Sequence, residues 1–127
     1  MSTQDDPDER RIYSVVGGFY AVYKELSHGL LEALYVLALE RELLARGHTI
    51  EREASVLVYY KGEPLGYQRI DLLVDGCVVV EAKSTRVLHP SAMRQAYNYL
   101  RVTKLEHGLL LHFGLEARWY RVFNPGE

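Results

Sequence analysis

The segment from Tyr67 to Lys83 places charged residues where an apolar β-hairpin would have a continuous core face. It reads Y-Q-R-I-D-L-L-V-D-G-C-V-V-V-E-A-K, so two apolar runs flank the dipeptide D-G, which is a strong hairpin signal. Asp71, Glu81 and Lys83 interrupt these runs. Because burial of an unpaired charge is costly, the three side chains need one another or a ligand, and the rest of the fold has to allow for this.

The register of the hairpin decides whether the three charges share a face. A two-residue turn would pair Val74 with Cys77 and put Asp71 on the face opposite Glu81. A three-residue loop with a glycine bulge would pair Leu73 with Cys77 and bring the three charges together. The second register leaves a uniformly apolar opposite face, and the sequence therefore predicts it. That face would hold Ile70, Leu72, Val74, Val78, Val80 and Ala82.

Hydrophobic periodicity predicts an α+β fold around this hairpin, in the element order ααβββαββ. The predicted helices are 10–26, 30–46 and 90–104, and the predicted strands are 48–60, 65–74, 77–83, 108–113 and 118–123. A mixed β-sheet flanked by helices accommodates this order. Residues 1–9 are acidic and lack periodicity, so we expect a disordered tail, followed by a single domain over residues 10–127.

Composition limits the class of protein. The chain has 127 residues, of which 48% are apolar, which is typical of a globular domain. It contains no apolar stretch suited to a signal peptide or a membrane span, so no membrane partner is expected. Its one cysteine, Cys77, excludes an internal disulfide and favours a cytoplasmic location. The net charge of −2 requires that any positive surface for nucleic acid be local.

Two carboxylates and an amine on one sheet face suggest a metal-dependent hydrolytic site. Asp71 and Glu81 carry hard oxygen ligands suited to Mg²⁺ or Mn²⁺, and the backbone carbonyl of Ala82 is a candidate third ligand. Lys83 would orient a metal-activated water. A structural salt bridge between Lys83 and one carboxylate explains the same D-x₉-E-x-K pattern and remains open at this point.

Three further residues are ordinary when each is considered alone. Glu32 lies at the edge of the apolar stripe of the second predicted helix, where partial exposure is common. Gln95 and Tyr99 are four residues apart on the last predicted helix, as expected of a core-edge amide and a packed ring.

The chain as a whole resembles the GxxExxY protein family, and the resemblance extends over nearly all of residues 12–121. The matching blocks are G-L-L-E-A-L-Y (29–35), Y-Y-K-G-E (59–63), R-I-D-L-L-V-D-G (69–76), V-V-E-A-K (79–83), Q-A-Y-N-Y-L (95–100) and G-L-L-L-H-F-G (108–114). That family is similar in turn to PD-(D/E)XK nucleases of the RecB and λ-exonuclease type. Their pattern is a helix Glu, a strand Asp, E-x-K and then Q-x-x-x-Y.

The resemblance implies a restriction-endonuclease-like core with a complete set of catalytic residues. These are Glu32, Asp71, Glu81, Lys83, Gln95 and Tyr99. Asp71 and Glu81 would hold Mg²⁺, Glu32 would act through water or a second metal, and Gln95 with Tyr99 would position the water, the lysine or a phosphate. His112 stands where the family usually has Asn, and we expect it to be structural.

The expected substrate is nucleic acid, with DNA favoured over RNA, and the expected activity is that of a metal-dependent deoxyribonuclease. Arg86 and Arg94 lie near the predicted site, so they are candidate phosphate contacts. No helix-turn-helix, RNA-binding aromatic motif or zinc-ligand spacing is present, so a partner protein or a homodimer would supply grip on DNA. Two alternatives stay open: a non-catalytic nucleic-acid-binding or assembly module, and a metal-dependent phosphohydrolase acting on a small nucleotide.

Overall fold

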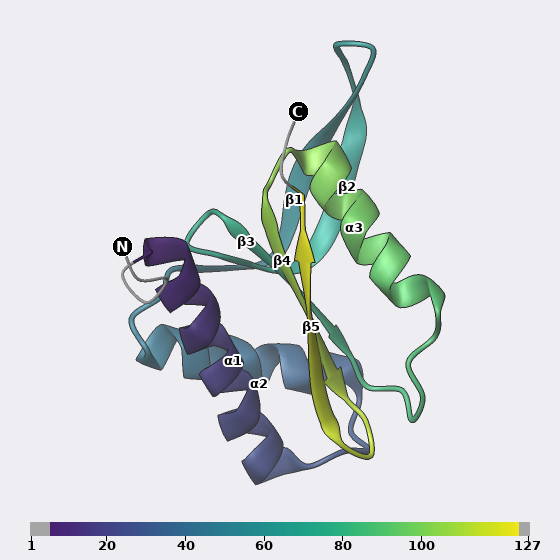
Figure 1. The fold of residues 1–127 in the computed structure, drawn as a ribbon. Coiled ribbons are helices and arrows are strands. Elements are labelled where there is room, and N and C mark those ends of the chain that lie inside the picture. The colour runs from purple at the N-terminus through teal and green to yellow at the C-terminus, as the bar shows by residue number, and fades with distance from the viewer. Residues whose placement is uncertain (1–5, 125–127) are drawn as a thin grey trace.

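The computed structural model describes residues 6–124 and has the predicted element order (Figure 1). The helices are α1 (Pro7–Leu26), α2 (Glu32–Ala45) and α3 (Ser91–Thr103), and the strands are β1 (Ile50–Tyr60), β2 (Glu63–Val74), β3 (Val78–Lys83), β4 (His107–Phe113) and β5 (Ala117–Phe123). Within the described range, no helix is both long and apolar enough to cross a membrane.

The five strands form one mixed sheet in the order β1-β2-β3-β4-β5, and only the β3–β4 pair is parallel. Helices α1 and α2 pack on one face of the sheet, and α3 packs on the other. Strand β4 is buried throughout, including its two histidines, as expected for a strand covered on both faces. The predicted α+β architecture, a mixed sheet flanked by helices, is therefore confirmed.

The prediction of a tail up to Glu9 is wrong at its C-terminal end, because α1 already begins at Pro7. The Asp6 side chain caps this helix by accepting the Asp8 N–H at 2.8 Å. A proline in the first turn lacks the N–H that would otherwise need a partner there, so Asp followed by Pro is a favourable helix start. The rest of the expected tail, residues 1–5, lies outside the described residues.

Helices α1 and α2 approach closely at a glycine pair in the middle of α1. A Cβ on Gly18 would lie 2.8 Å from the Leu43 side chain of α2, and one on Gly17 would lie 3.0 Å from the Arg46 guanidinium. The glycines cost helix propensity, but they give the α2 side chains room to pack against α1.

The predicted hairpin register is wrong by two residues, although the predicted grouping of the charges is unaffected. Val74 pairs with Val78, whereas the prediction paired Leu73 with Cys77. Asp75 and Gly76 have positive φ values of 53° and 70°, and the Cys77 N–H donates to the Val74 carbonyl at 3.0 Å. Cys77 therefore belongs to the loop. Because side chains alternate with a period of two, a shift of two residues leaves Asp71 and Glu81 on the same side.

The predicted apolar face is also wrong at Ile70. This residue packs with Val79 and Leu100 beneath α3, whereas Leu72 and Val74 belong to the cluster under α1 and α2. The facing strand explains the difference, because Glu53 of β1 has a left-handed φ of 54°. The β1–β2 ladder pairs Arg52 with Leu72 and Ala54 with Ile70, and it skips the position between them. The regular alternation is therefore interrupted at Asp71.

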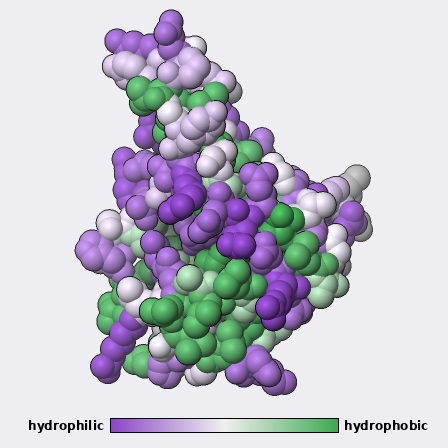
Figure 2. Space-filling view, turned by 180° about the vertical axis from the view of Figure 1, so that it is seen from behind, coloured by the Kyte–Doolittle hydropathy of each residue, from purple (hydrophilic) through white to green (hydrophobic). Residues whose placement is uncertain are grey.

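Figure 2 shows the molecule from behind, with apolar side chains gathered over its lower part and a narrower arm of mixed hydropathy above them. The arm is the far end of the β1–β2 hairpin, which extends beyond the helices (Figure 1). Leu30, Leu34 and Leu37 line a groove of about 510 Å³ between α1 and α2.

The turn between β2 and β3 is held to α1 and to the start of β1 by Asp75. One carboxylate oxygen accepts the Arg11 Nε at 2.9 Å and contacts His48 Nδ1 at 2.8 Å. The other accepts the Thr49 N–H at 2.8 Å. Burial raises the pKa of Asp75, but the bonds from His48, Thr49 and Arg11 outweigh it and hold the pKa at about 2.

Asp75→Asn should lower the free energy of unfolding at pH 7 by about 1–2 kcal/mol, after allowance for solvent screening. The pKa is depressed, so the stabilisation is complete above the ordinary value of 3.8 and is lost as the pH falls towards about 2. Chemical denaturation at pH 7 and pH 3 measures the difference. Glu116→Gln, which removes an exposed ion pair with Arg118, is the control and should change stability by less than about 0.5 kcal/mol. Equal stability of Asp75→Asn and wild type at pH 7 would contradict the assignment.

Candidate active site

The ladder between β2 and β3 ends just where the predicted carboxylates begin. Its last pair is Leu72 with Val80, and beyond this pair side chains replace backbone carbonyls as acceptors. The Asp71 N–H donates to Glu81 Oε1 at 3.3 Å, and the Ala82 N–H donates to Asp71 Oδ2 at 2.8 Å. Each carboxylate therefore satisfies a backbone donor on the opposite strand, which holds the two acids together where the strands separate.

Burial and mutual repulsion make this pair electrostatically unfavourable. Glu81 is 8% exposed. Burial, and then the neighbouring Asp71 charge, raise the pKa of Glu81 far above its ordinary value of 4.5, and Lys83 offsets only part of this effect. Two adjacent carboxylates with depleted solvation favour a bound proton or a bound cation.

Glu32 joins the pair from the first residue of α2. It is half-buried, and its pKa is raised first by burial and then by the Asp71 charge, while Lys83 lowers it. The positive charge of Lys83 lowers the pKa of both Glu32 and Glu81, so it acts on both acids. Among residues 6–124, Lys83 makes no ion pair within 4.0 Å, so the structural salt bridge that the sequence left open is not formed.

Tyr35 is a positioning residue whose role the sequence interpretation missed. Its hydroxyl donates to the Ser27 carbonyl at 2.6 Å and accepts the Leu30 N–H at 3.2 Å, so it closes the loop that leads into Glu32. Its ring is fully buried and stacks on Phe113 at a centroid distance of 4.1 Å. The spacing E-x-x-Y was the available signal, because it places the ring one helical turn after the acid.

Helix α3 brings Tyr99 towards the acids from the other face of the sheet. The pKa of Tyr99 is raised by burial and by the charges of Glu81 and Asp71, and it is lowered by a side-chain hydrogen bond from Gln95. Tyr99 therefore lies within electrostatic reach of the two carboxylates, and Gln95 contacts its hydroxyl. Arg94 instead lies over the ring of Tyr97, with 5.9 Å between the guanidinium carbon and the ring centroid.

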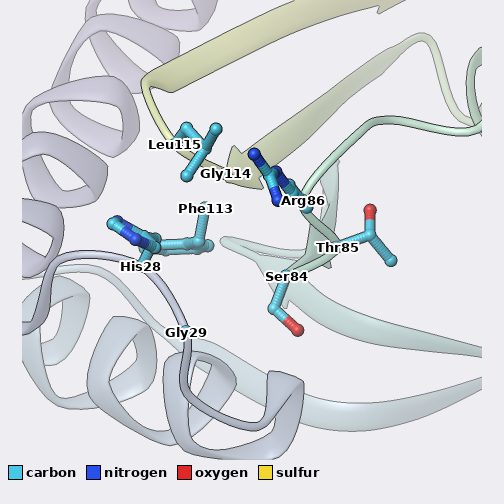
Figure 3. Close-up of a pocket in the computed structure, with 8 residues that line it drawn as sticks. All are labelled: His28, Gly29, Ser84, Thr85, Arg86, Phe113, Gly114 and Leu115. Atoms are coloured by element: carbon cyan, nitrogen blue, oxygen red, sulfur yellow. The ribbon is translucent and has the colours of Figure 1, made fainter.

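One surface hollow includes two of the carboxylates, and a second lies at the residues that follow Lys83 in the chain. The β2 hollow, of about 280 Å³, is lined by Glu32, Arg52, Glu53, Arg69 and Asp71, with apolar residues of α2. The β4 hollow, of about 260 Å³, is lined by His28, Gly29, Ser84, Arg86, Phe113 and Gly114, with neighbouring residues (Figure 3). The predicted phosphate contact Arg86 lies in the β4 hollow, whereas Arg94 lines neither hollow.

His112 fixes the segment that follows β3. Its Nε2 lies 2.6 Å from the Thr85 carbonyl, and since a carbonyl only accepts, Nε2 is the donor. The ring is 5% exposed, and a Cβ on Gly114 would lie 2.6 Å from it. This contact agrees with the expectation of a structural histidine.

The residues present fit a divalent cation by the chemistry of their donors. Within residues 6–124, no three His, Cys, Asp or Glu side chains already converge as a metal site. Two carboxylates are nevertheless held close together, each by a backbone N–H group of the opposite strand, and the neighbouring Asp71 charge that raises the pKa of Glu81 is one that a bound cation would offset. Hard oxygen donors of this kind suit Mg²⁺ or Mn²⁺.

Comparison with known proteins agrees with the fold. The crystal structure of SSO0001 is similar, with a TM-score of 0.57 and 21% identity, over 74% of this chain and 50% of that one. At this identity the likeness concerns the fold alone, and the present chain spans half the length of that structure. No curated protein matches the chain. The narrower resemblance to the GxxExxY family stays a prediction.

A family model described as the PD-(D/E)XK nuclease superfamily matches residues 9–122. This range contains all eight helices and strands except the first two residues of α1 and the last residue of β5. It also contains every residue of the candidate site. The chain therefore belongs to the PD-(D/E)XK nuclease superfamily.

Proposed function

We propose that the protein hydrolyses phosphodiester bonds in DNA with the help of Mg²⁺ or Mn²⁺. The observation that carries this proposal is the contact between Asp71 and Glu81 where β2 and β3 separate. Superfamily membership supports a nuclease-like activity, and DNA as the substrate rests on the resemblance to RecB and λ-exonuclease proteins.

Asp71 and Glu81 would hold the cation through carboxylate oxygens, together with the Ala82 carbonyl and with Glu32 through water. When bound, the cation supplies positive charge to the scissile phosphate and makes water more acidic. Lys83 would orient the attacking water and offset the negative charge that develops during a one-step displacement. Gln95 and Tyr99 would hold Lys83 or a phosphate oxygen in place from α3.

The proposed site lies in a chain of 127 residues with a net charge of −2, so a second copy or a partner protein is proposed to add contacts to DNA. The apolar groove between α1 and α2 supports the proposal that a second copy or a partner protein adds grip. The β2 and β4 hollows are bordered largely by exposed residues. This arrangement favours a polymeric substrate over a small nucleotide, which would require an enclosed pocket.

Purified protein should cleave DNA in Mg²⁺ or Mn²⁺ and not in EDTA. Asp71→Asn should reduce the rate at least about 100-fold, because it removes a carboxylate donor. Lys83→Met should do the same, because it removes the amine while keeping the length of the side chain. Lys24→Met, at an exposed position on α1, is the matched control and should retain the wild-type rate.

Single-stranded and double-stranded DNA and RNA are compared in the same gel assay. Cleavage that persists unchanged in Asp71→Asn and Lys83→Met would contradict the proposed site. No cleavage of any DNA by folded wild-type protein would contradict the proposed activity.

Glu81→Gln should stabilise the metal-free protein at pH 8. The raised pKa of Glu81 means that the folded state keeps a proton that the unfolded state has released above about pH 4.5. The free energy of unfolding of the wild type therefore falls as the pH rises from about 4.5 to about 8. The neutral amide of Glu81→Gln avoids that loss. Thermal unfolding in EDTA should show the advantage of Glu81→Gln at pH 8 and a much smaller advantage at pH 4.5.

Excess Mg²⁺ should raise the unfolding temperature of the wild type at pH 8, because a ligand that binds only the folded state stabilises it. The same addition should raise that of Glu81→Gln much less. Equal responses of the two proteins would argue against Glu81 as a metal ligand.

A further inference from the structure

The β2 and β4 hollows lie on opposite sides of the candidate active site. β3 carries Glu81 and Lys83 and runs between β2 and β4 in the sheet. The β2 hollow includes Glu32 and Asp71 themselves. The β4 hollow includes Ser84, which follows Lys83 directly. It also includes Gly29, which lies three residues before Glu32 in the loop that leads into α2. A linear substrate that crosses the acids would therefore enter one hollow and leave by the other.

Each hollow contains one arginine that is available for an external anion. Among the described residues, Arg69 and Arg86 form no ion pair within 4.0 Å, whereas Arg52 of the β2 hollow is paired with Glu40 at 3.1 Å. Both unpaired arginines are exposed. A guanidinium presents a planar set of donors that matches phosphate oxygens.

The β4 hollow contains His28 in addition to Arg86. His28 and Arg86 lie on opposite sides of it, with Phe113 and Gly114 between them (Figure 3). The floor is rigid, because Phe113 is fully buried and packs on Tyr35. The Gly114 carbonyl accepts the Tyr23 hydroxyl at 2.7 Å, so this oxygen is already bonded.

Beyond the β2 hollow, strand β2 carries an exposed aromatic ring. Tyr67 is 73% exposed and precedes Arg69 by two residues. Because Ile70 is buried beneath α3, strand alternation puts Tyr67 and Arg69 on the face away from α3. Four residues of strand separate Tyr67 from Asp71, which is about 13 Å. An exposed ring can stack on an unpaired base of any sequence.

We propose that a single nucleic-acid strand crosses the site along this line. Its bases stack on Tyr67, and its backbone phosphates contact Arg69 in the β2 hollow. Further phosphates contact Arg86 and His28 in the β4 hollow, and one phosphodiester lies over Glu32, Asp71 and Glu81. This inference rests on the proposed nuclease function and assigns the strandedness of the substrate and the contacts on each side. Glu53 lines the β2 hollow as well, and its negative charge opposes the contact with Arg69.

Binding is measured in EDTA, so the outcome does not depend on catalysis. Fluorescence anisotropy of a labelled single-stranded oligonucleotide of mixed sequence gives the affinity between about 50 and 200 mM salt. Arg69→Ala and Arg86→Ala should each weaken binding several-fold and lower the slope of log affinity against log salt by about 0.7, the value for one phosphate contact on a single strand. Arg86→Lys should keep the slope, and Glu53→Gln should tighten binding.

Arg10→Ala is the matched control. Arg10 is exposed on α1, next to the residue that pairs with Asp75 at the far end of β3 from Lys83. It should bind like the wild type. Tyr67→Ala should weaken binding by about fivefold or more, and Tyr67→Phe, which keeps the ring, should not. Thermal unfolding confirms that each variant is folded.

The proposed line is overturned if Arg69→Ala and Arg86→Ala leave the salt slope unchanged, or if only one of them lowers it. Tighter binding of a duplex of the same sequence, with no effect of Tyr67→Ala, would overturn the single-strand assignment. These results are separate from the cleavage assay. A failure of the binding predictions would not contradict the metal-dependent cleavage. Absence of cleavage would not affect the binding results.

Discussion

The site depends on the separation of β2 and β3 at Asp71 and Glu81. A regular ladder would satisfy the backbone donors with carbonyls and would leave the buried Glu81 and the half-buried Asp71 with no partner. Here the acids themselves accept the Asp71 and Ala82 N–H groups, so opening the ladder costs no unsatisfied backbone donor. The same two hydrogen bonds hold the two carboxylates close together. The backbone is therefore well bonded, and the pair of acids favours a bound cation.

Buried aromatic and polar contacts position the residues around this opening. Tyr35 ties the loop before α2 to the Phe113 ring of β4, and His112 ties the segment after β3 to the same strand. Strand β4 is parallel to β3 and covered on both faces. Both segments that carry site residues are therefore anchored to the most buried strand, and a rigid scaffold of this kind keeps a catalytic group in place without a bound ligand.

The acids at the two ends of β3 have opposite pKa shifts, and their neighbours explain why. At its start, Asp75 satisfies both carboxylate oxygens with Arg11, His48 and Thr49, and its pKa is held low. At its end, Glu81 has too few positive neighbours, and its pKa is raised. One acid contributes stability and the other costs stability. Strain of this kind is common where a site must bind a charged ligand.

The sequence by itself determined the order of elements and the placement of Asp71 and Glu81 on the same side of the hairpin. Both follow from short-range rules, namely periodicity and the two-residue alternation of a strand, and alternation survives an error of two residues in register. Only the tertiary structure decided the face of Ile70 and the end of the β2–β3 ladder at Leu72. The first depends on a left-handed residue in the neighbouring strand, Glu53, and the second on the Asp71 and Glu81 side chains, which accept the backbone N–H groups beyond that pair. The loop at Cys77 and the start of α1 at Pro7 are local features, set by the positive φ values of Asp75 and Gly76 and by the Asp6 cap. The convergence of Glu32 and Tyr99 on the same acids also required the fold, because helix packing across both faces of a sheet joins residues that no local pattern connects.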